Sequence, residues 1–565
     1  MNKKSSKGIT FAIIALLLMA VLLLGGYLAL AFFGHNLNQK DSPEKGSVYE
    51  EIPQHVVQEP QVLPHNRWNL VIEPAFGHVT SFRDGIAAVR IGDWESGLWG
   101  VIDTEGNFVL PPIFTSMNNT HVFGQYMSMD RPIEFFPVQL DGKWGLLDRS
   151  GNEVIPFIYD EIFLFDNGMA RVVIGEWPYQ MHGLINPQTG EEIVPLVYSF
   201  ISPPHEGFME VRVGSPLDIG QVGFIDETGR EVIPPIYNFS QSFRYGMVVV
   251  GFGFDWQTVG WLLVDDTGRE ISNPGYDEIR ILSENVLAFR TGDWERGQWI
   301  LRNREGEEIS SYIFSDIFGS NEEFVVVSKD PPGDNRTFGL YNFIENRMVI
   351  PVGLYSSIHP NFDRDLVNVS VGGWTRYRRE GIKEISTGRM VVEPVYDQAF
   401  SLTTDRMAIR SGGEWTDEWN NIDGGKWGVV DRYGREILPT AFSSVQYFAP
   451  GLFTVVTGEL AMYQGQRHET RTGLVRDDGT KVLPIEYRTI STLIGGFSIT
   501  HIGGRWEIHP EWGIYTIVDG RFGVIDERGN VIIPAELEFD SIMPISENMA
   551  AVLVGDKWGF IRIEL

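Results

Sequence analysis

The sequence predicts an all-β repeat array of about twelve antiparallel meanders, each with three or four strands, preceded by one transmembrane helix. Three observations support this fold class. A Trp-Gly hairpin signature recurs along the chain at intervals of about forty residues. No window after residue 34 sustains a 3.6-residue apolar period, so long amphipathic helices are not expected. Glycine and proline supply 62 and 30 of the 565 residues, which is typical of a turn-rich chain.

One slot of the repeat can be followed along the whole array. It is mostly aromatic, and a glycine follows it in most copies. Leu262 and Ile300 replace that glycine in two units, while Glu380 and Thr472 mark units in which the aromatic residue itself is lost. The twelve occupants of the slot are Trp99, Trp144, His182, Val222, Trp261, Trp299, Phe338, Glu380, Trp427, Thr472, Phe522 and Trp558.

The slot opens a predicted hairpin. Trp99 and Val101 face one side of a short strand, because successive residues of a strand alternate between its faces. Asp103 is expected to cap the following turn with its carboxylate, and Gly106 to take the positive-φ position. A return strand over residues 107–110 ends at proline, which cannot donate to a ladder.

A third strand completes the unit. A Gly-x-Ala-x-Val motif over residues 82–89 recurs over residues 165–172, and it leads into the next Trp strand. A segment such as residues 159–162 is the candidate for a fourth strand. Both faces of these strands carry apolar residues, so each small sheet is expected to stack between its neighbours.

The combined pattern resembles the bacterial WG-repeat family, which is named for its Trp-Gly pair. The resemblance covers roughly residues 68–565. It implies an all-β repeat array and a binding or scaffolding role. It supplies no shared catalytic residue.

The two ends of the array are complementary. Residues 68–74 read as the return strand of a hairpin, and residues 557–562 read as the Trp strand of one. The two can pair across the termini, as in the closure of a β-propeller. Twelve units exceed the usual four to eight blades. Two arrangements are therefore compatible with the sequence. One is propeller-like rings, including two six-unit halves with a break near residues 303–308, and the other is an open superhelix.

The N-terminal segment predicts a membrane anchor. Residues 1–8 form a basic tail, and residues 9–33 carry no charge over a length that spans a bilayer. Lysines before the span predict a cytoplasmic N-terminus and extracytoplasmic repeats. Ala31 lies in a sequence that resembles a signal-peptidase site, so a cleaved and secreted chain is the alternative. Residues 34–66 read as a flexible tether before the array at residues 67–565.

Composition and motifs argue against several functions. The formal net charge of −30 disfavours nucleic-acid partners. The absence of cysteine excludes thiol nucleophiles and zinc–thiolate sites. The histidines are scattered, and no P-loop, complete dinucleotide loop or zincin motif is present, so no metal, cofactor or enzymatic activity is expected. The turn aspartate recurs from unit to unit, which indicates a structural rather than a catalytic role.

Loops that precede several Trp strands carry a second tryptophan. A tryptophan beside a carboxylate suits a sugar ring, because the ring face stacks and the carboxylate accepts hydroxyl hydrogens. Packing of a loop tip between units is the alternative interpretation. The candidate ligand-binding residues are Trp94, Trp177, Trp294, Trp374 and Trp415.

These observations predict a membrane-anchored, non-catalytic scaffold that binds a protein or a cell-envelope polymer such as a glycan. The alternative is a carbohydrate-active enzyme, a glycoside hydrolase or lyase, with its site in the concavity of the array. An isolated pair of convergent carboxylates would favour the enzyme.

Overall fold

Most of the predicted array is described by the computed structural model. The described residues are 68–93, 95–117, 132–214, 220–253, 258–273, 275–293, 296–330, 333, 336–372, 378–415, 422–458, 462–463, 466–467, 470–508, 515–535 and 539–564. The predicted basic tail, transmembrane helix and tether lie outside them. Within the described ranges, no helix has the length and apolar character needed to cross a bilayer. The single helix there is the short 3-10 helix η1 (Phe362–Arg364).

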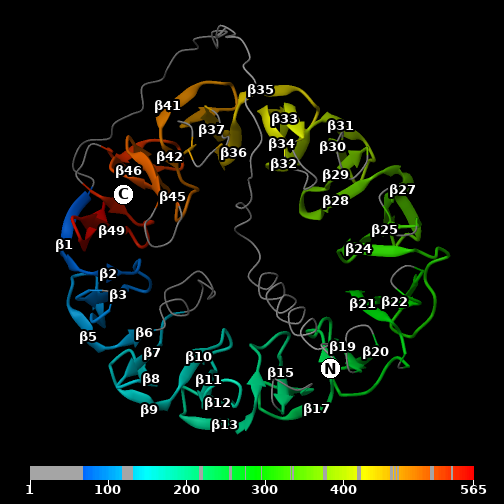
Figure 1. Ribbon diagram of the computed structural model, residues 1–565, viewed down its shortest axis with the longest axis horizontal. Helices are drawn as coiled ribbons and strands as arrows, with labels where there is room; N and C mark the ends of the chain where they lie inside the picture. The colour runs from blue at the N-terminus through cyan, green and yellow to red at the C-terminus, as the bar shows by residue number, and fades with distance from the viewer. Residues whose placement is uncertain are drawn as a thin grey trace, which may run out of the picture. The chain divides into compact units, whose positions relative to one another are not determined.

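The described residues belong to one compact unit, and their strands build twelve small antiparallel sheets around a ring (Figure 1). Each sheet contacts the next one along the chain, and the last sheet contacts the first. The propeller-like arrangement predicted from the repeat is therefore confirmed. The ring is closed, so the open superhelix was the wrong alternative. Residues 303–308, where a division into two six-unit halves was one alternative, include a turn in which the Asn303 N–H donates to the Glu307 carbonyl.

The first strand of each sheet lies at the inner edge of the ring (Figure 1). These inner strands are β2 (His78–Val79), β6 (Ser116–Met117), β10 (Glu161–Leu164), β14 (Phe200–Ile201), β18 (Phe239–Ser240), β21 (Glu278–Ser283), β24 (Asp316–Ser320), β28 (Ser357–Asn361), β32 (Gln398–Ser401), β36 (Ser444–Ala449), β42 (Thr489–Ile490) and β48 (Ser541–Ile542).

The second strand of each sheet occupies the place of the predicted third strand of the unit, and the Gly-x-Ala-x-Val motif itself stands at residues 85–89 and 168–172. These strands are β3 (Ile86–Ile91), β7 (Phe135–Leu140), β11 (Ala170–Ile174), β15 (Phe208–Val213), β19 (Met247–Phe252), β22 (Val286–Thr291), β25 (Phe324–Ser328), β29 (Leu366–Val371), β33 (Arg406–Trp415), β37 (Leu452–Thr457), β43 (Phe497–Ile502) and β49 (Met549–Val554).

The third strand of every sheet holds one occupant of the Trp slot, as the repeat predicts. These strands are β4 (Leu98–Asp103), β8 (Lys143–Asp148), β12 (Met181–Asn186), β16 (Gln221–Asp226), β20 (Gly260–Asp265), β23 (Gln298–Arg302), β26 (Phe338–Asn342), β30 (Arg379–Glu384), β34 (Ile422–Asp431), β40 (Arg471–Arg476), β46 (Arg521–Asp526) and β50 (Lys557–Ile563).

Ten of the twelve described sheets have a fourth strand on the outside of the ring. The outer strands are β1 (Trp68–Phe76), β5 (Phe108–Phe114), β9 (Glu153–Tyr159), β13 (Glu191–Tyr198), β17 (Glu231–Tyr237), β27 (Arg347–Tyr355), β31 (Met390–Tyr396), β35 (Glu436–Phe442), β41 (Lys481–Tyr487) and β47 (Val531–Ile533). Two extra hairpins, β38 (Met462–Tyr463) with β39 (Gln466–Arg467) and β44 (Arg505–Ile508) with β45 (Tyr515–Val518), connect second and third strands.

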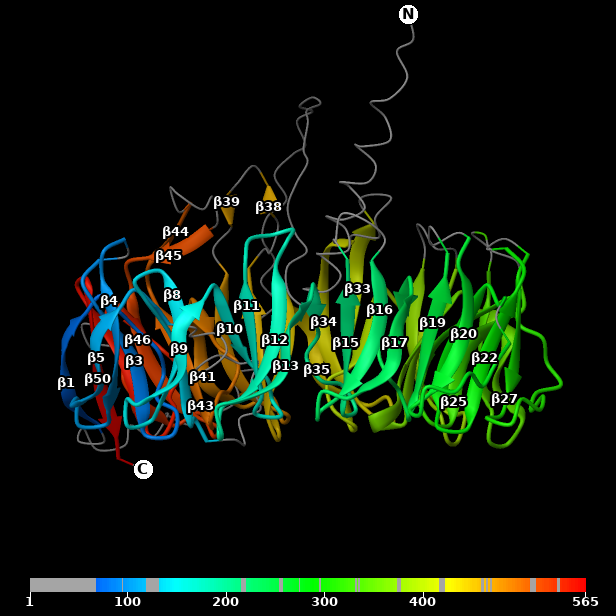
Figure 2. The same ribbon diagram turned by 90° about the horizontal axis from the view of Figure 1, so that it is seen from below.

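We call the face that carries these two hairpins the upper face of the ring, and the opposite face the lower face (Figure 2). Where they are described, the connections between second and third strands lie on the upper face. The described turns between first and second strands, and between third and fourth strands, lie on the lower face.

The glycine after the Trp slot determines whether the outer strand can form. The outer strand is bulged, and it crosses so close that a Cβ on Gly428 would lie 2.7 Å from the Leu438 carbonyl oxygen. Leu262 and Ile300 replace this glycine in the two sheets that have three strands, β18-β19-β20 and β21-β22-β23. Isolated bridges are the remnant of the outer strand there. The two exceptions in the sequence therefore explain the two exceptions in the fold.

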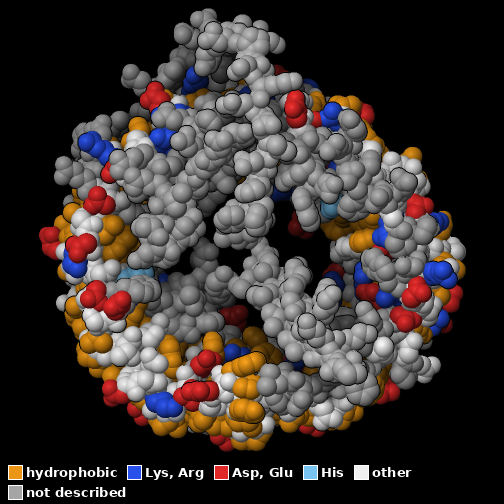
Figure 3. All heavy atoms as spheres, viewed as in Figure 1, with side chains coloured by type: hydrophobic (Ala, Val, Ile, Leu, Met, Phe, Trp, Pro, Cys, Tyr) orange, Lys and Arg blue, Asp and Glu red, His pale blue; other side chains and the backbone are white. Residues whose placement is uncertain are grey.

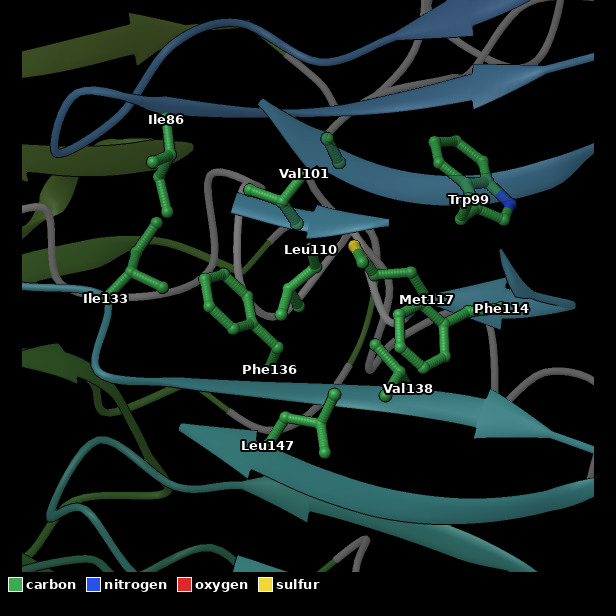
Figure 4. Packing of buried hydrophobic residues seen from close by; sticks show 11 residues of the cluster. Ile86, Trp99, Val101, Leu110, Phe114, Met117, Ile133, Phe136, Val138 and Leu147 are labelled. Carbon is green, nitrogen blue, oxygen red and sulfur yellow. The ribbon is translucent and has the colours of Figure 1, made fainter. Parts of the chain in front are cut away.

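The hydrophobic core is divided among the interfaces between neighbouring sheets. In the described part of the chain, twelve buried clusters fill the twelve interfaces. Figure 4 shows the cluster in which Trp99 and Val101 pack with Phe136 of the next sheet. Ile102, on the other face of the same strand, packs against the preceding sheet. The predicted alternation of faces is confirmed, and every sheet is buried on both sides.

Candidate binding surfaces of the ring

Of the predicted tryptophan loops, the one that carries Trp177 is described, and it lies on the upper face. Trp177 lies in the β11–β12 connection and is 67% exposed. Trp415 ends β33, but its side chain lies outside the described part of the structure. Trp94, Trp294 and Trp374 also lie outside the described residues. A ligand-binding role for these five residues stays a prediction.

Asp93, which precedes Trp94 in the sequence, accepts hydrogen bonds from its own loop. Asp93 Oδ1 accepts hydrogen bonds from the Ser96 hydroxyl at 2.7 Å, the Ser96 N–H at 2.7 Å and the Glu95 N–H at 3.1 Å. The Ser96 hydrogen bonds are the main cause of the lowered pKa of Asp93. Asp293 accepts from the Arg296 N–H in the matching loop. These aspartates therefore order the loops, a role that the sequence interpretation had not assigned to them.

The recurring turn aspartate is also structural, as predicted. In each such turn, Oδ1 accepts from the backbone N–H groups two and four residues later. Asp148, for example, binds the Ser150 N–H and the Asn152 N–H at 2.8 Å each, and its Oδ2 binds the Asn152 amide. The hydrogen bond from the Asn152 side chain is the largest cause of the lowered pKa of Asp148. The same arrangement occurs at Asp103, Asp226, Asp265, Asp431 and Asp526.

The inner strands contain a slot that differs from sheet to sheet. In the sheet of β32, for example, Gln398 pairs with Arg410 of the second strand, and Arg410 pairs with Trp427 in the Trp slot. The variable slot lies two residues after Gln398, at Phe400. The intervening residue, here Ala399, points into the core. The described occupants of this inner-wall slot are Thr80, Phe163, Ser202, Gln241, Arg280, Phe318, His359, Phe400, Gln446, Ser491 and Met543.

These eleven side chains are exposed or half-buried, and none of them is acidic although the chain has 75 acidic residues. Three phenylalanines, Phe163, Phe318 and Phe400, are interspersed among hydrogen-bonding side chains along the inner wall. Phe400 is 39% exposed and makes an edge contact with Trp427 at 5.3 Å between ring centroids. The fold therefore determines where these side chains lie, but it does not depend on which residue type occupies each position.

Polar side chains of one sheet satisfy the carbonyl groups of the next inner strand. Arg171 Nη1 donates to the Ile201 carbonyl at 2.6 Å, and the Asn368 amide donates to the Ala399 carbonyl at 2.7 Å. Arg280 Nη1 donates to a carbonyl of β24 in the same way. An unpaired inner edge would otherwise expose a row of carbonyl acceptors. These contacts hold the inner wall in place from one sheet to the next.

A cleft of about 480 Å³ opens at the lower, inner side of the sheets that contain β18, β21 and β24. Its size is within the range of small-molecule sites, roughly 300–1,000 Å³. The β18–β19 turn contributes Gln241 and Arg244, β21 contributes Arg280, and β24 contributes Phe318. His205, from the β14–β15 connection, completes one side. The cleft is therefore on the opposite face from the loop that carries Trp177.

The sequence interpretation missed this cleft, although one signal was available. Gln241, Arg280 and Phe318 are 39 and 38 residues apart, which matches the period of the Trp slot. In an alignment of the units, these three residues occupy one slot, and the variation of that slot from unit to unit indicates a surface position. Nothing in the sequence alone shows that the slots of three units meet at one cleft.

No group of three or more histidine, aspartate or glutamate side chains suited to a metal ion occurs within the described ranges. Acidic and basic side chains are interspersed around the rim of the face seen in Figure 3.

Seven segments of the chain match the family model described as "WG containing repeat": residues 69–93, 99–120, 144–176, 183–215, 223–253, 263–293 and 522–558. A search of curated proteins found no match.

Solved structures with a similar arrangement have low TM-scores. The tricorn protease has a TM-score of 0.23 and 10% identity, over 83% of this chain and 55% of that one. The uncharacterized protein lmo1340 from Listeria monocytogenes EGD-e has a TM-score of 0.25 and 11% identity, over 60% of this chain and 97% of that one. Prolyl oligopeptidase B from Galerina marginata has a TM-score of 0.22 and 11% identity, over 57% and 55%. The chain thus spans about half the length of the two peptidases.

Proposed function

Because the chain belongs to the WG-repeat family, we propose that it is a non-catalytic scaffold that binds a protein or a cell-envelope polymer on the wall of its ring. One observation carries the proposal. The residues that recur in the sheets, the Trp slot and the turn aspartate, are used by the fold, whereas the exposed inner-wall slot varies and contains no carboxylate among its described occupants.

The chemistry of the inner-wall slot suits an extended, hydroxyl- or amide-rich ligand. The face of an exposed aromatic ring such as Phe318 or Phe400 stacks on sugar rings or apolar side chains. His359 and Gln446 supply hydrogen-bonding groups between them in the ring. Weak contacts repeated on linked sites add up to a high avidity for a ligand that touches several sheets. A polymer or an extended protein segment gains from this arrangement more than a small molecule does.

Membrane anchorage is part of the proposal. It is supported by the uncharged residues 9–33 and by Lys3, Lys4 and Lys7 before them. Protease added to intact cells is expected to digest the repeats and to leave the N-terminal segment in the membrane. Protection of the repeats from external protease would contradict this location.

A pair of matched variants tests the binding role. The full-length chain is assayed for retention on insoluble envelope polymer and for crosslinking to envelope proteins. Phe400→Ala, on the inner wall, is expected to weaken retention several-fold, while Phe108→Ala, on outer strand β5 with 46% exposure, leaves it unchanged. Equal retention of both variants on both kinds of partner would contradict the inner wall as the binding surface. Release of new sugar ends from the polymer would contradict a non-catalytic role.

A further inference from the structure

We propose that the cleft at the lower, inner side of β18, β21 and β24 binds a sugar-sized ligand that carries a carboxylate or a phosphate group. The inference deepens the proposed function, on which it rests, because it names a ligand class for one part of the inner wall. It is carried by three features of the cleft: an arginine with donors to spare, a second arginine held in the wall, and a lining without carboxylates.

Arg244 is the group that can meet an oxyanion. Its side chain is exposed at the cleft, and Nη1 donates to the Ile281 carbonyl at 3.1 Å. Within the described residues, this carbonyl is the one hydrogen-bond acceptor of the Arg244 guanidinium, which also lies 5.3 Å from the centroid of the Tyr245 ring. A guanidinium group has five N–H donors in a fixed fork, so the remaining donors can bind a carboxylate or phosphate. The contact with Ile281 uses one donor of the fork, and Arg244 lines the cleft.

Arg280 is part of the cleft wall. Its guanidinium lies 4.7 Å from the centroid of the Trp299 ring, forms a 2.6 Å ion pair with Glu278 and donates to the Ile317 carbonyl. Glu278 is shared with Arg290, whose Nη2 lies 3.4 Å from the second carboxylate oxygen. Two arginines therefore surround one carboxylate, and this group of three keeps one net positive charge beside Arg244.

The remaining lining suits the body of a sugar. Phe318 is 38% exposed and offers an aromatic ring. Gln241 and Ser242 supply amide and hydroxyl groups from the β18–β19 turn, and His205 supplies an imidazole. None of the residues that line the cleft is acidic, although the chain carries a net charge of −30. A neutral sugar would leave the charge of Arg244 without a partner, so the anionic group is the part of the ligand that the cleft selects.

Calorimetric titration of the full-length chain tests this assignment with four probes: glucuronic acid, glucose 6-phosphate, glucose and inorganic phosphate. The two anionic sugars are expected to bind, more weakly as the salt concentration rises, and each at least tenfold more tightly than glucose or inorganic phosphate. Equal binding of glucose would overturn the anionic requirement. Equal binding of inorganic phosphate would overturn the sugar-sized body.

Two arginine variants place the binding in the cleft. Arg244→Gln is expected to weaken binding of glucuronic acid by about tenfold, as the loss of a charge-assisted contact does. The control, Arg230→Gln, removes the same charge from an exposed turn after β16, and it is expected to keep the affinity of the unmodified chain. Unchanged affinity of Arg244→Gln, with circular dichroism confirming the fold of both variants, would overturn the proposal.

An oligosaccharide made of hexuronate residues distinguishes a polymer from a free small ligand. Tighter binding than the monomer, by tenfold or more, would show that the cleft holds one unit of an acidic polymer. Equal affinity would show that the cleft takes a free sugar acid or sugar phosphate. Both results support the proposal, and failure of all anionic sugars to bind overturns it. The scaffold role is tested separately. If the chain still binds envelope polymer and Phe400→Ala weakens that binding, the scaffold role stands even though the cleft binds no anionic sugar.

Discussion

Trp68 of β1 lies directly opposite Ile563 of β50, so the first and last strands of the array are neighbours in one antiparallel sheet. The register continues through Leu70 opposite Ile561 and ends at Phe76 opposite Trp558. Phe560, which is fully buried, makes an edge contact with Phe82 of the next sheet at 4.8 Å. The ring is therefore held closed by strand pairing and by the two core clusters to which β1 and β50 contribute.

Deletion of residues 558–565 is expected to lower the melting temperature of the whole ring. The deletion exposes the edge of β1 and removes Phe560 and Ile561 from two interfaces. Loss of one large buried side chain alone costs about 3–5 kcal/mol. Differential scanning calorimetry of the full-length chain measures the effect, with removal of Leu565 alone as the control. An unchanged melting temperature after the longer deletion would show that closure adds nothing to stability.

Gly428→Leu is expected to detach β35 from its sheet. The added Cβ would meet the Leu438 carbonyl oxygen at 2.7 Å, and backbone atoms cannot move aside as a flexible side chain can. Overpacking of this kind costs about 1–3 kcal/mol. Hydrogen exchange over residues 436–442 is expected to become faster, while Gly333→Leu, at a position with open space around it, leaves exchange there unchanged. Unaltered protection of β35 in Gly428→Leu would contradict the role assigned to this glycine.

Two tryptophans are expected to respond differently to truncation. Trp299 is 1% exposed, so Trp299→Ala should lower the free energy of unfolding by about 3–5 kcal/mol. Trp177 is 67% exposed, so Trp177→Ala should change it by about 0.5 kcal/mol or less. Urea denaturation measures both. If Trp177→Ala also weakens retention on envelope glycan, the upper-face loop belongs to the binding surface; if it destabilises the fold as Trp299→Ala does, the sugar-binding interpretation of this loop is wrong.

His182 is expected to make the ring less stable in acid. Burial, followed by the nearby charge of Arg171, lowers the pKa of His182 to about 4 in the folded chain. The unfolded chain, with a histidine pKa of about 6.5, takes up the proton first. The stabilisation is therefore complete above pH 6.5 and is lost as the pH falls toward 4, by about 3 kcal/mol in total.

His182→Phe isolates this effect, because phenylalanine occupies the same slot at Phe338 and Phe522. The difference in unfolding free energy between the unmodified chain and His182→Phe, measured by urea denaturation, is expected to change by about 3 kcal/mol between pH 7 and pH 4. Parallel pH profiles for the two chains would contradict the burial of a neutral imidazole at this position.

The sequence predicted the internal plan of each sheet because that plan depends on local chemistry. Asp148 caps its own turn, Trp99 and Val101 share a strand face, and the glycine after the slot allows a close crossing. Each of these relationships joins residues within one unit of the repeat. The replacements at Leu262 and Ile300 were visible as well, but their consequence, a sheet without an outer strand, required the geometry of the crossing.

The candidate surfaces were less predictable because they join residues of different units. The tryptophan loops attract attention in the sequence, yet Asp93 in one of them is engaged by Ser96. Arg244 and Phe318 lie 74 residues apart in the sequence and line one cleft. Only the angle at which successive sheets follow one another brings them together.

The sequence by itself determined that the array is all-β, where each Trp strand lies, which residues turn the chain and that the two ends complement each other. These features can be predicted because the same local interactions recur in most units of the repeat. The tertiary structure decided that the units form one closed ring and which inner-wall side chains meet. Closure depends on the small rotation between neighbouring sheets, which the packing in each interface sets. These rotations add up over the whole array, so the sequence of a single unit does not determine whether the ring closes.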